Sequence, residues 1–250
     1  MPNASALLTV DALVFDAYGT LFDVHSVATL AEELATGHGA ALSQLWRAKQ
    51  LEYTWLSSLM AIPGRPRDDF AVVTSQALDF ALASLKVDLG NRERDRLRSA
   101  YLALAPFPDV VAALTVLAPR PRWILSNGTL AMLEPVIRKS GLAAHLDGVL
   151  SVDAAGIFKP SPRVYQLALD RLRLPAARIG FVSSNCWDAI GAKAFGFTSF
   201  WINRTGAPVD LHGPAPDRIL SKLGDLPPLL DRNDDACPGN GASAAGSSSR

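Results

Sequence analysis

The sequence predicts an α/β fold: a doubly wound, mostly parallel sheet with an inserted helical cap subdomain. Two observations support the fold class. Short apolar segments alternate with helical stretches along most of the chain, and one long helical stretch interrupts this alternation directly after the first apolar segment. A chain of 250 residues has room for one such domain with an insertion.

Five segments are expected to form strands, because each is short, apolar and bounded by turn residues. They are 12–15, 123–125, 148–151, 179–182 and 199–202. Helical stretches separate them, so we expect helices on both faces of the sheet.

The stretch 24–100 is expected to be almost entirely helical. One helical stripe is formed by Leu42, Leu45, Trp46, Tyr53, Leu56 and Met60. The segment 63–66 (Pro-Gly-Arg-Pro) ends that helix, and further helices are expected over 71–85 and from Asn91. The insertion is far longer than the dozen or so residues that a crossover needs, which favours a cap over the active-site end of the sheet.

The expected organisation therefore has three parts. Residues 1–23 and 101–231 form the α/β core domain, and residues 24–100 form the cap. Residues 232–250 are small, polar and rich in Gly and Ser, which predicts a disordered tail.

The composition excludes several functional classes. The chain is 49% apolar and 19% charged with a formal net charge of +0, so no basic excess favours binding to nucleic acid or to a membrane surface. Apolar stretches are too short for a membrane span, and residues 1–5 lack signal-peptide features. Cys186 and Cys237 provide neither a disulfide framework nor zinc spacing. A soluble, cytoplasmic protein is expected.

The first predicted strand ends in a carboxylate, Asp16, followed by a turn with Gly19 and the hydroxyl of Thr20. Ligands bind at such strand ends in open α/β sheets, although an Asp that only caps a turn would have the same pattern. The segment resembles the nucleophile motif of the haloacid dehalogenase (HAD) superfamily, whose phosphatases carry a second Asp as general acid. Tyr18 occupies that position, and a phenol does not normally protonate a leaving alkoxide near neutral pH. The motif therefore favours a carboxylate nucleophile without phosphoryl transfer.

Two further segments follow predicted strands. Ser126, Asn127 and Gly128 can hold an anion through neutral donors, although this is also a common turn. Lys159, held next to Pro160, is suited to keep a carboxylate nucleophile ionised. A solvated loop lysine is the alternative.

The segment after 179–182 bears on metal binding. In the superfamily's phosphatases this strand end carries two Asp residues that hold Mg²⁺. Here Ser184 takes the first position and only Asp188 remains. Because Tyr18 replaces another acid, a divalent cation loses most of its anionic oxygen ligands. No metal and no cofactor are expected.

Together these motifs resemble the type II L-2-haloacid dehalogenases over residues 11 to about 230. The segment 46–56, which contains Arg47, is the most discriminating match because it is characteristic of this subfamily. The resemblance implies that Asp16 is the nucleophile, that Lys159 pairs with it, and that Ser126 binds the substrate carboxylate.

The resemblance also implies three groups of supporting residues. The departing halide is surrounded by Arg47, Asn127 and Trp187. The nucleophile and the hydrolytic water are oriented by Thr20, Tyr165, Ser183, Asn185 and Asp188. The apolar wall is formed by Tyr18, Leu51 and Trp187.

Helical spacing agrees with the role of Arg47, because Arg47, Leu51 and Trp55 share a partly apolar helical face. A snorkelling arginine paired with a nearby Glu is the alternative. The chain departs from the family at Ala48, where the family has glutamine, and at an apparent insertion over 62–66, which leaves open whether Phe70 lines the pocket. Both departures bear on substrate size.

The expected function is metal-free hydrolysis of short L-2-haloalkanoic acids to D-2-hydroxy acids and halide. The reaction is expected to pass through an Asp16 ester with inversion at C2, and the family suggests a homodimer. Three alternatives stay open: ring opening of a strained heterocycle such as azetidine-2-carboxylate, a HAD phosphatase, and a non-catalytic binding protein with this fold.

Overall fold

The computed structural model describes residues 7–60 and 66–231. Its sheet contains β1 (Ala12–Phe15), β2 (Arg122–Ser126), β3 (Gly148–Ser151), β4 (Ile179–Ser183), β5 (Thr198–Ile202) and β6 (Arg218–Leu220). The strand order is β3-β2-β1-β4-β5-β6, and every neighbouring pair is parallel. The predicted α/β fold class is confirmed. β6 was not predicted, because three residues carry too little periodicity to be recognised as a strand.

The order of the strands places a binding crevice at the centre of the sheet. β1 and β4 are neighbours although two strands separate them in the sequence, so the winding direction reverses between them. Both strands are buried along their whole length. The carboxyl ends of parallel strands at such a reversal are where ligands bind.

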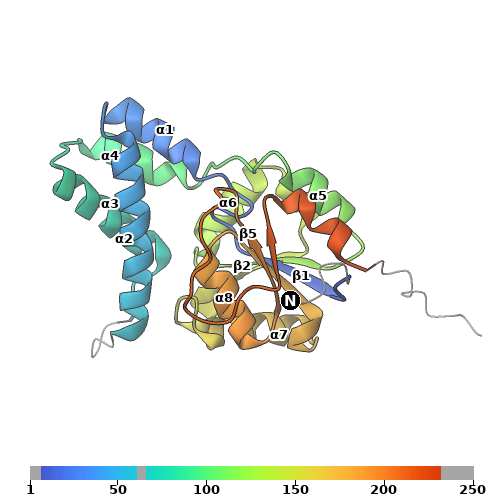
Figure 1. The fold of residues 1–250 in the computed structure, drawn as a ribbon. Helices are drawn as coiled ribbons and strands as arrows, with labels where there is room; N and C mark the ends of the chain where they lie inside the picture. The colour runs from blue at the N-terminus through green and yellow to red at the C-terminus, as the bar shows by residue number, and fades with distance from the viewer. Residues whose placement is uncertain (1–6, 61–65, 232–250) are drawn as a thin grey trace, which may run out of the picture.

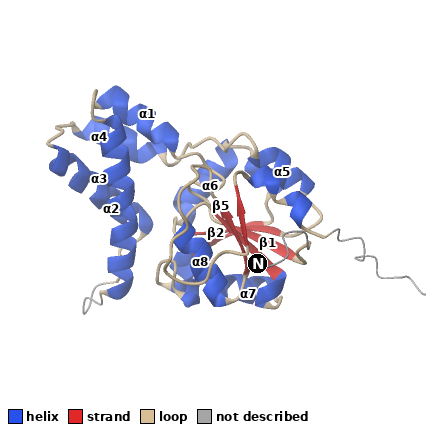
Figure 2. Cartoon of the chain, viewed as in Figure 1, coloured by secondary structure: helices blue, strands red, loops and turns tan. Residues whose placement is uncertain are grey.

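Helices surround the sheet (Figure 2). They include α5 (Val110–Val116), α6 (Leu130–Lys139), α7 (Pro162–Leu172) and α8 (Cys186–Phe195). α8 begins directly after β4, so its first turn lies at the carboxyl end of the sheet.

A separate group of helices lies to one side of the sheet (Figure 1). It contains α1 (His25–Leu34), α2 (Gly39–Leu59), α3 (Phe70–Leu85) and α4 (Asn91–Ala100). We call α1–α4 the cap; its status as a subdomain over 24–100, apart from a core of 1–23 and 101–231, stays a proposal. The predicted tail, 232–250, and most of the apparent insertion at 62–66 lie outside the described residues.

The buried face of α2 differs from the predicted stripe. The buried residues are Gly39, Leu42, Trp46, Gln50 and Thr54. Leu56 and Met60 are instead 38% and 57% exposed. The helix that the stripe predicted is confirmed by α2, but hydrophobicity alone did not indicate that Gln50 and Thr54 are buried, with the amide and the hydroxyl satisfied by hydrogen bonds.

Within the described residues, no helix combines the length and apolar character needed to cross a membrane. Cys186 is a buried free cysteine. Cys237 lies outside the described residues.

Candidate active site

Asp16 lies directly after β1 and is buried, with 7% of its surface exposed. Lys159 Nζ is 3.2 Å from its Oδ1. The hydroxyl of Thr20 and the amide of Asn185 donate to its Oδ2 at 3.1 and 3.0 Å. Donors from three separate segments therefore fix the carboxylate, as expected for a group that must attack in one direction.

Lys159 is almost completely buried between two carboxylates, at 3.2 Å from Asp16 and 2.9 Å from Asp188. Burial opposes the ammonium charge, but attraction to Asp16 and Asp188 outweighs it and raises the pKa of Lys159. The backbone N–H of Lys159 donates to Asn127 Oδ1 at 3.1 Å, which holds the loop. The predicted pairing of Lys159 with Asp16 is present in the geometry.

Asp188 occupies the first turn of α8 and is completely buried. The phenol of Tyr165 donates to its Oδ1 at 2.8 Å. Burial raises the pKa of Asp188, while Lys159 and the Tyr165 hydrogen bond counteract part of that shift. Burial also raises the pKa of Tyr165, so it stays a neutral donor.

A second layer of contacts joins the β1 turn to the loop after β4. Thr20 Oγ1 accepts from the backbone N–H of Ser184 at 2.8 Å, and Ser183 Oγ accepts from that of Asn185 at 3.1 Å. Ser183 thus shapes the loop that presents Asn185. Sequence reasoning treated Ser184 only as a missing metal ligand and did not foresee its contact with Thr20.

A small cavity of about 10 Å³ adjoins Asp16. Its walls come from both the cap and the sheet end. The lining residues are Asp16, Tyr18, Arg47, Leu51, Phe70, Ser126, Asn127, Lys159, Asn185 and Trp187. All six residues predicted to bind substrate are therefore brought together. Phe70, whose place was left open, also lines this cavity, and its ring stacks on that of Tyr18 at 6.0 Å.

Several polar groups on these walls suit an anion. The indole N–H of Trp187 and the hydroxyl of Tyr18 are buried without a hydrogen-bond partner in the part of the chain that the structure describes. The guanidinium of Arg47 reaches from α2 to Asn185 Oδ1 at 3.4 Å. These donors around a carboxylate provide a place for a departing anion opposite a nucleophile.

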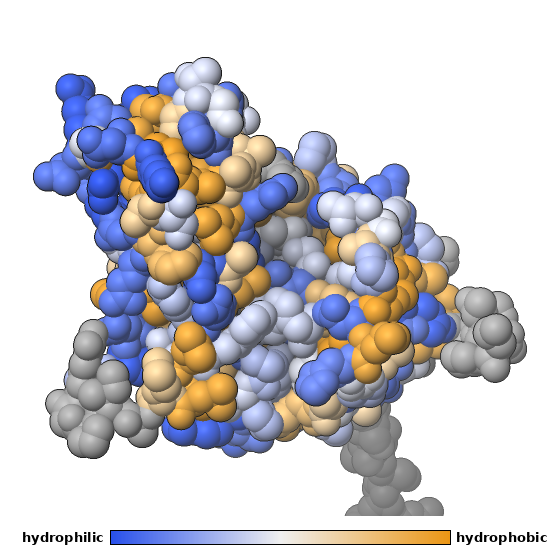
Figure 3. All heavy atoms as spheres, turned by 60° about the vertical axis from the view of Figure 1, so that its left-hand side comes forward, coloured by the Kyte–Doolittle hydropathy of each residue, from blue (hydrophilic) through white to orange (hydrophobic). Residues whose placement is uncertain are grey.

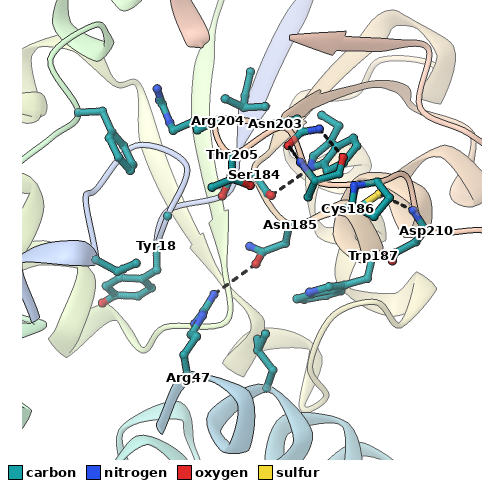
Figure 4. Close-up of a pocket in the computed structure, with 18 residues that line it drawn as sticks. Tyr18, Arg47, Ser184, Asn185, Cys186, Trp187, Asn203, Arg204, Thr205 and Asp210 are labelled. Carbon is teal, nitrogen blue, oxygen red and sulfur yellow. Dashed lines mark hydrogen bonds between the residues drawn. The ribbon is translucent and has the colours of Figure 1, made fainter. Parts of the chain in front are cut away.

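A larger cavity of about 430 Å³ lies next to the first one. Five residues line both cavities and form the wall between them: Tyr18, Arg47, Leu51, Asn185 and Trp187. Figure 4 shows Arg47 rising from a cap helix toward Asn185, with Tyr18 and Trp187 on opposite sides. The surface between cap and core is hollowed in Figure 3. The larger cavity is thus the natural approach to Asp16.

Sequence reasoning missed two buried polar residues behind Arg47. Gln50 Oε1 accepts from the guanidinium of Arg47 at 2.6 Å, and Gln50 Nε2 donates to Thr74 Oγ1 at 2.6 Å. The spacing of Arg47 and Gln50, i and i+3 on one helix, was a usable signal. No local pattern pointed to Thr74, because it lies on a different helix.

The acidic residues do not gather into a metal site. Across residues 7–60 and 66–231, no group of three or more His, Cys, Asp or Glu side chains lies together. Asp16 and Asp188 instead share the ammonium of Lys159, which balances their charge.

The chain is similar in sequence to known proteins. A family model for haloacid dehalogenase-like hydrolases matches residues 10–196. An (S)-2-haloacid dehalogenase of Pseudomonas sp. (strain YL) is 46% identical over 216 residues, which are 86% of this chain and 91% of that protein.

Solved structures give the same relationship. A crystal structure of an L-2-haloacid dehalogenase is 45% identical with a TM-score of 0.85, covering 89% of this chain and 99% of that one. The enzyme of Xanthobacter autotrophicus, solved with chloropropionic acid covalently bound, is 40% identical with a TM-score of 0.81, covering 88% and 98%. The resemblance inferred from the sequence motifs is confirmed.

Proposed function

This chain belongs to the haloacid dehalogenase-like hydrolase family, and from that premise we propose that it hydrolyses short L-2-haloalkanoic acids to D-2-hydroxy acids and halide. The level of identity to (S)-2-haloacid dehalogenases supports the reaction and its substrate class. A relative with chloropropionic acid covalently bound supports a covalent intermediate.

In the first step, a carboxylate oxygen of Asp16 attacks C2 of the substrate from the side opposite the halogen. The C–O bond forms as the C–halogen bond breaks, so the configuration at C2 inverts and the halide departs with the bonding electrons. Arg47, Asn127 and Trp187 surround the halide, and Ser126 binds the substrate carboxylate. Charge on the halide grows only as the bond breaks, so these donors act mainly on the transition state.

In the second step, water attacks the carbonyl carbon of the Asp16 ester. The C2–O bond is retained, so the 2-hydroxy acid leaves with the original Asp16 oxygen, which takes one proton of the water. The other proton is released, and Asp16 returns to a carboxylate that keeps the oxygen from water. Asp188 and Asn185 lie beside Asp16, where they orient the water, while Lys159 balances the charge of both carboxylates. Tyr18, Leu51 and Trp187 form the apolar wall, which keeps competing water away from the first step.

The observation that carries this proposal is the placement of Arg47. A cation from the cap lies within hydrogen-bond distance of Asn185, and Asn185 itself donates to the nucleophile Asp16. A phosphatase would need an acid at the position of Tyr18 and a cation site, where this chain has a phenol and an ammonium.

The test is halide release from a panel of L- and D-2-halo acids, run with and without exhaustive EDTA treatment. We expect release from the L enantiomers only, with no loss on chelation. Loss of activity with EDTA and turnover of a phosphate monoester would overturn the proposal. Turnover of azetidine-2-carboxylate without any halide release would instead favour ring opening.

Two further parts of the proposal concern the whole protein. We expect a cytoplasmic homodimer. The exposed apolar side chains Leu59, Val72 and Phe80 on α2 and α3 support self-association. Light scattering on the purified protein tests the dimer, and cell fractionation tests the location.

A further inference from the structure

Gln50 is a completely buried carboxamide on α2 with both of its polar ends engaged. Its Oε1 accepts from Arg47 at 2.6 Å, and its Nε2 donates to Thr74 Oγ1 at 2.6 Å. Burying an amide is unfavourable unless it is hydrogen-bonded in this way. This fully buried residue of the cap therefore holds Arg47 in place.

The direction of the Gln50 amide is determined by its neighbours. Thr74 donates its only hydroxyl proton to the backbone carbonyl of Phe70 at 2.6 Å, so its oxygen is left to accept from the Nε2 group of Gln50. Gln50 must then present its oxygen to Arg47, whose guanidinium is purely a donor. A flipped amide would break both contacts at once.

The contacts continue from Gln50 to the nucleophile. Arg47 donates to Asn185 Oδ1 at 3.4 Å, which turns the Asn185 NH₂ group toward Asp16 Oδ2 at 3.0 Å. One chain of hydrogen bonds thus runs from α3 through α2 and across the cap–core boundary to the carboxylate.

The acceptor that holds Arg47 is neutral. In the part of the chain that the structure describes, no carboxylate forms an ion pair with Arg47. A neutral acceptor fixes the guanidinium in place and leaves its whole charge for a developing anion. A carboxylate at the same position would also fix it but would cancel that charge.

We propose that Gln50 is a positioning residue for the leaving group: its buried neutral amide, anchored by Thr74, aims the charge of Arg47 at the departing halide. The proposal rests on the proposed dehalogenase function. It predicts that changes at Gln50 slow formation of the Asp16 ester much more than its hydrolysis, because the halide is present only in the first step.

The experiment compares Gln50→Met, Gln50→Glu and Thr74→Val with Gln76→Met as the control. Gln76 is an exposed carboxamide of the same cap that bonds to Asp68, away from the cavity. Rapid-quench mass spectrometry measures ester formation and ester hydrolysis separately, for 2-chloropropionate and 2-bromopropionate. Bromide inhibition measures halide affinity without relying on the rate of either step.

We expect Gln50→Met to slow ester formation by about 10- to 100-fold, more for chloride than for bromide as leaving group, and to slow ester hydrolysis much less. Gln50→Glu keeps an acceptor but should weaken bromide inhibition at least tenfold. Thr74→Val should act in the same direction with a smaller change, and it covers the case in which Gln50→Met does not fold. Gln76→Met should match the wild type.

Equal slowing of both steps, or unchanged bromide inhibition in Gln50→Glu, would overturn the positioning role and leave Gln50 as a packing residue. These results are distinct from failure of the proposed function, which would appear as no halide release by the wild-type protein.

Discussion

At the scale of single residues, the contacts of Asp16 set it apart from Asp11. Its Oδ1 faces an ammonium and its Oδ2 accepts two hydrogen bonds. Asp11, at the opposite end of the same strand, instead pairs with Arg178 and is partly exposed. Burial beside Lys159 at the carboxyl end of β1 therefore distinguishes Asp16, the proposed nucleophile, from an ordinary surface aspartate.

Asp16→Asn should therefore retain the fold and lose activity by about 10⁴-fold or more, because a neutral amide cannot displace the halide. Asp11→Asn is the control and should keep full activity. In ¹⁸O-water, the wild-type enzyme should acquire label in Asp16 after many turnovers, as measured by mass spectrometry of its peptides. Unlabelled Asp16 would mean that water attacks the substrate directly.

We expect the acidic limb of the pH dependence of kcat to follow the protonation of Asp188. Burial raises its pKa from the usual 3.8, so the carboxylate is lost on acidification at a higher pH than in a solvated aspartate. The acidic limb of the kcat profile should therefore lie above pH 3.8. On the alkaline side, the raised pKa of Lys159 keeps the ammonium charged beyond its usual 10.5.

Tyr165→Phe should move the acidic limb to higher pH, because it removes a hydrogen bond that favours the charged form of Asp188. Tyr53→Phe, on the cap, is the control and should leave the profile unchanged. A pH–rate profile for each variant measures the shift. A limb that stays in place in Tyr165→Phe would show that Asp188 does not control it.

At the scale of elements, a glycine on α8, Gly191, leaves space for the Tyr165 hydroxyl. A Cβ added at Gly191 would lie 2.6 Å from Tyr165 Oη and 2.7 Å from Pro160 Cβ, too close for either contact. The absence of a side chain at this position of α8 lets the phenol of α7 reach Asp188.

Gly191→Ala should displace Tyr165 and slow hydrolysis of the Asp16 ester by about tenfold, with a loss of about 1–3 kcal/mol in the free energy of unfolding. Gly224→Ala is the control, because its nearest neighbour would be Lys222 Cε at 3.9 Å. Ester accumulation in rapid-quench samples and urea unfolding measure the two effects. If the ester does not accumulate, Tyr165 is unnecessary for the second step.

At the scale of the whole molecule, contacts between cap and core close the site. Arg67 pairs with Asp153 at 2.9 Å and stacks on the ring of Phe158 at 3.8 Å. Ser58 Oγ accepts from the backbone N–H of Phe158 at 3.2 Å. Because the cavity beside Asp16 has a volume of only about 10 Å³, we expect the cap to move when substrate enters.

Arg67→Ala should lower the population of the closed form and raise KM several-fold, with a smaller effect on kcat. Arg98→Ala is the control, because Arg98 pairs with Asp79 and Asp95 inside the cap. Steady-state kinetics and hydrogen exchange of α3 measure the two effects. An unchanged KM together with unchanged exchange would show that this contact does not hold the cap.

The sequence alone was sufficient to predict the alternation of strands and helices, the carboxylate after β1 and the motif residues that follow later strands. These features depend on short-range periodicity and on residues a few positions apart. The fold class and the family resemblance were accordingly predicted correctly, although β6 was too short to be recognised.

Only the tertiary structure decided which residues from separate elements meet. Phe70 lines the cavity because α3 packs beside α2, and Gln50 is buried because Thr74 of α3 and Arg47 satisfy its amide. Leu56 and Met60 belong to the apolar stripe of the sequence, yet they are exposed. A polar residue is stable in the interior only when its partners are in place, and partners on different helices are brought together by packing, which no local sequence pattern records.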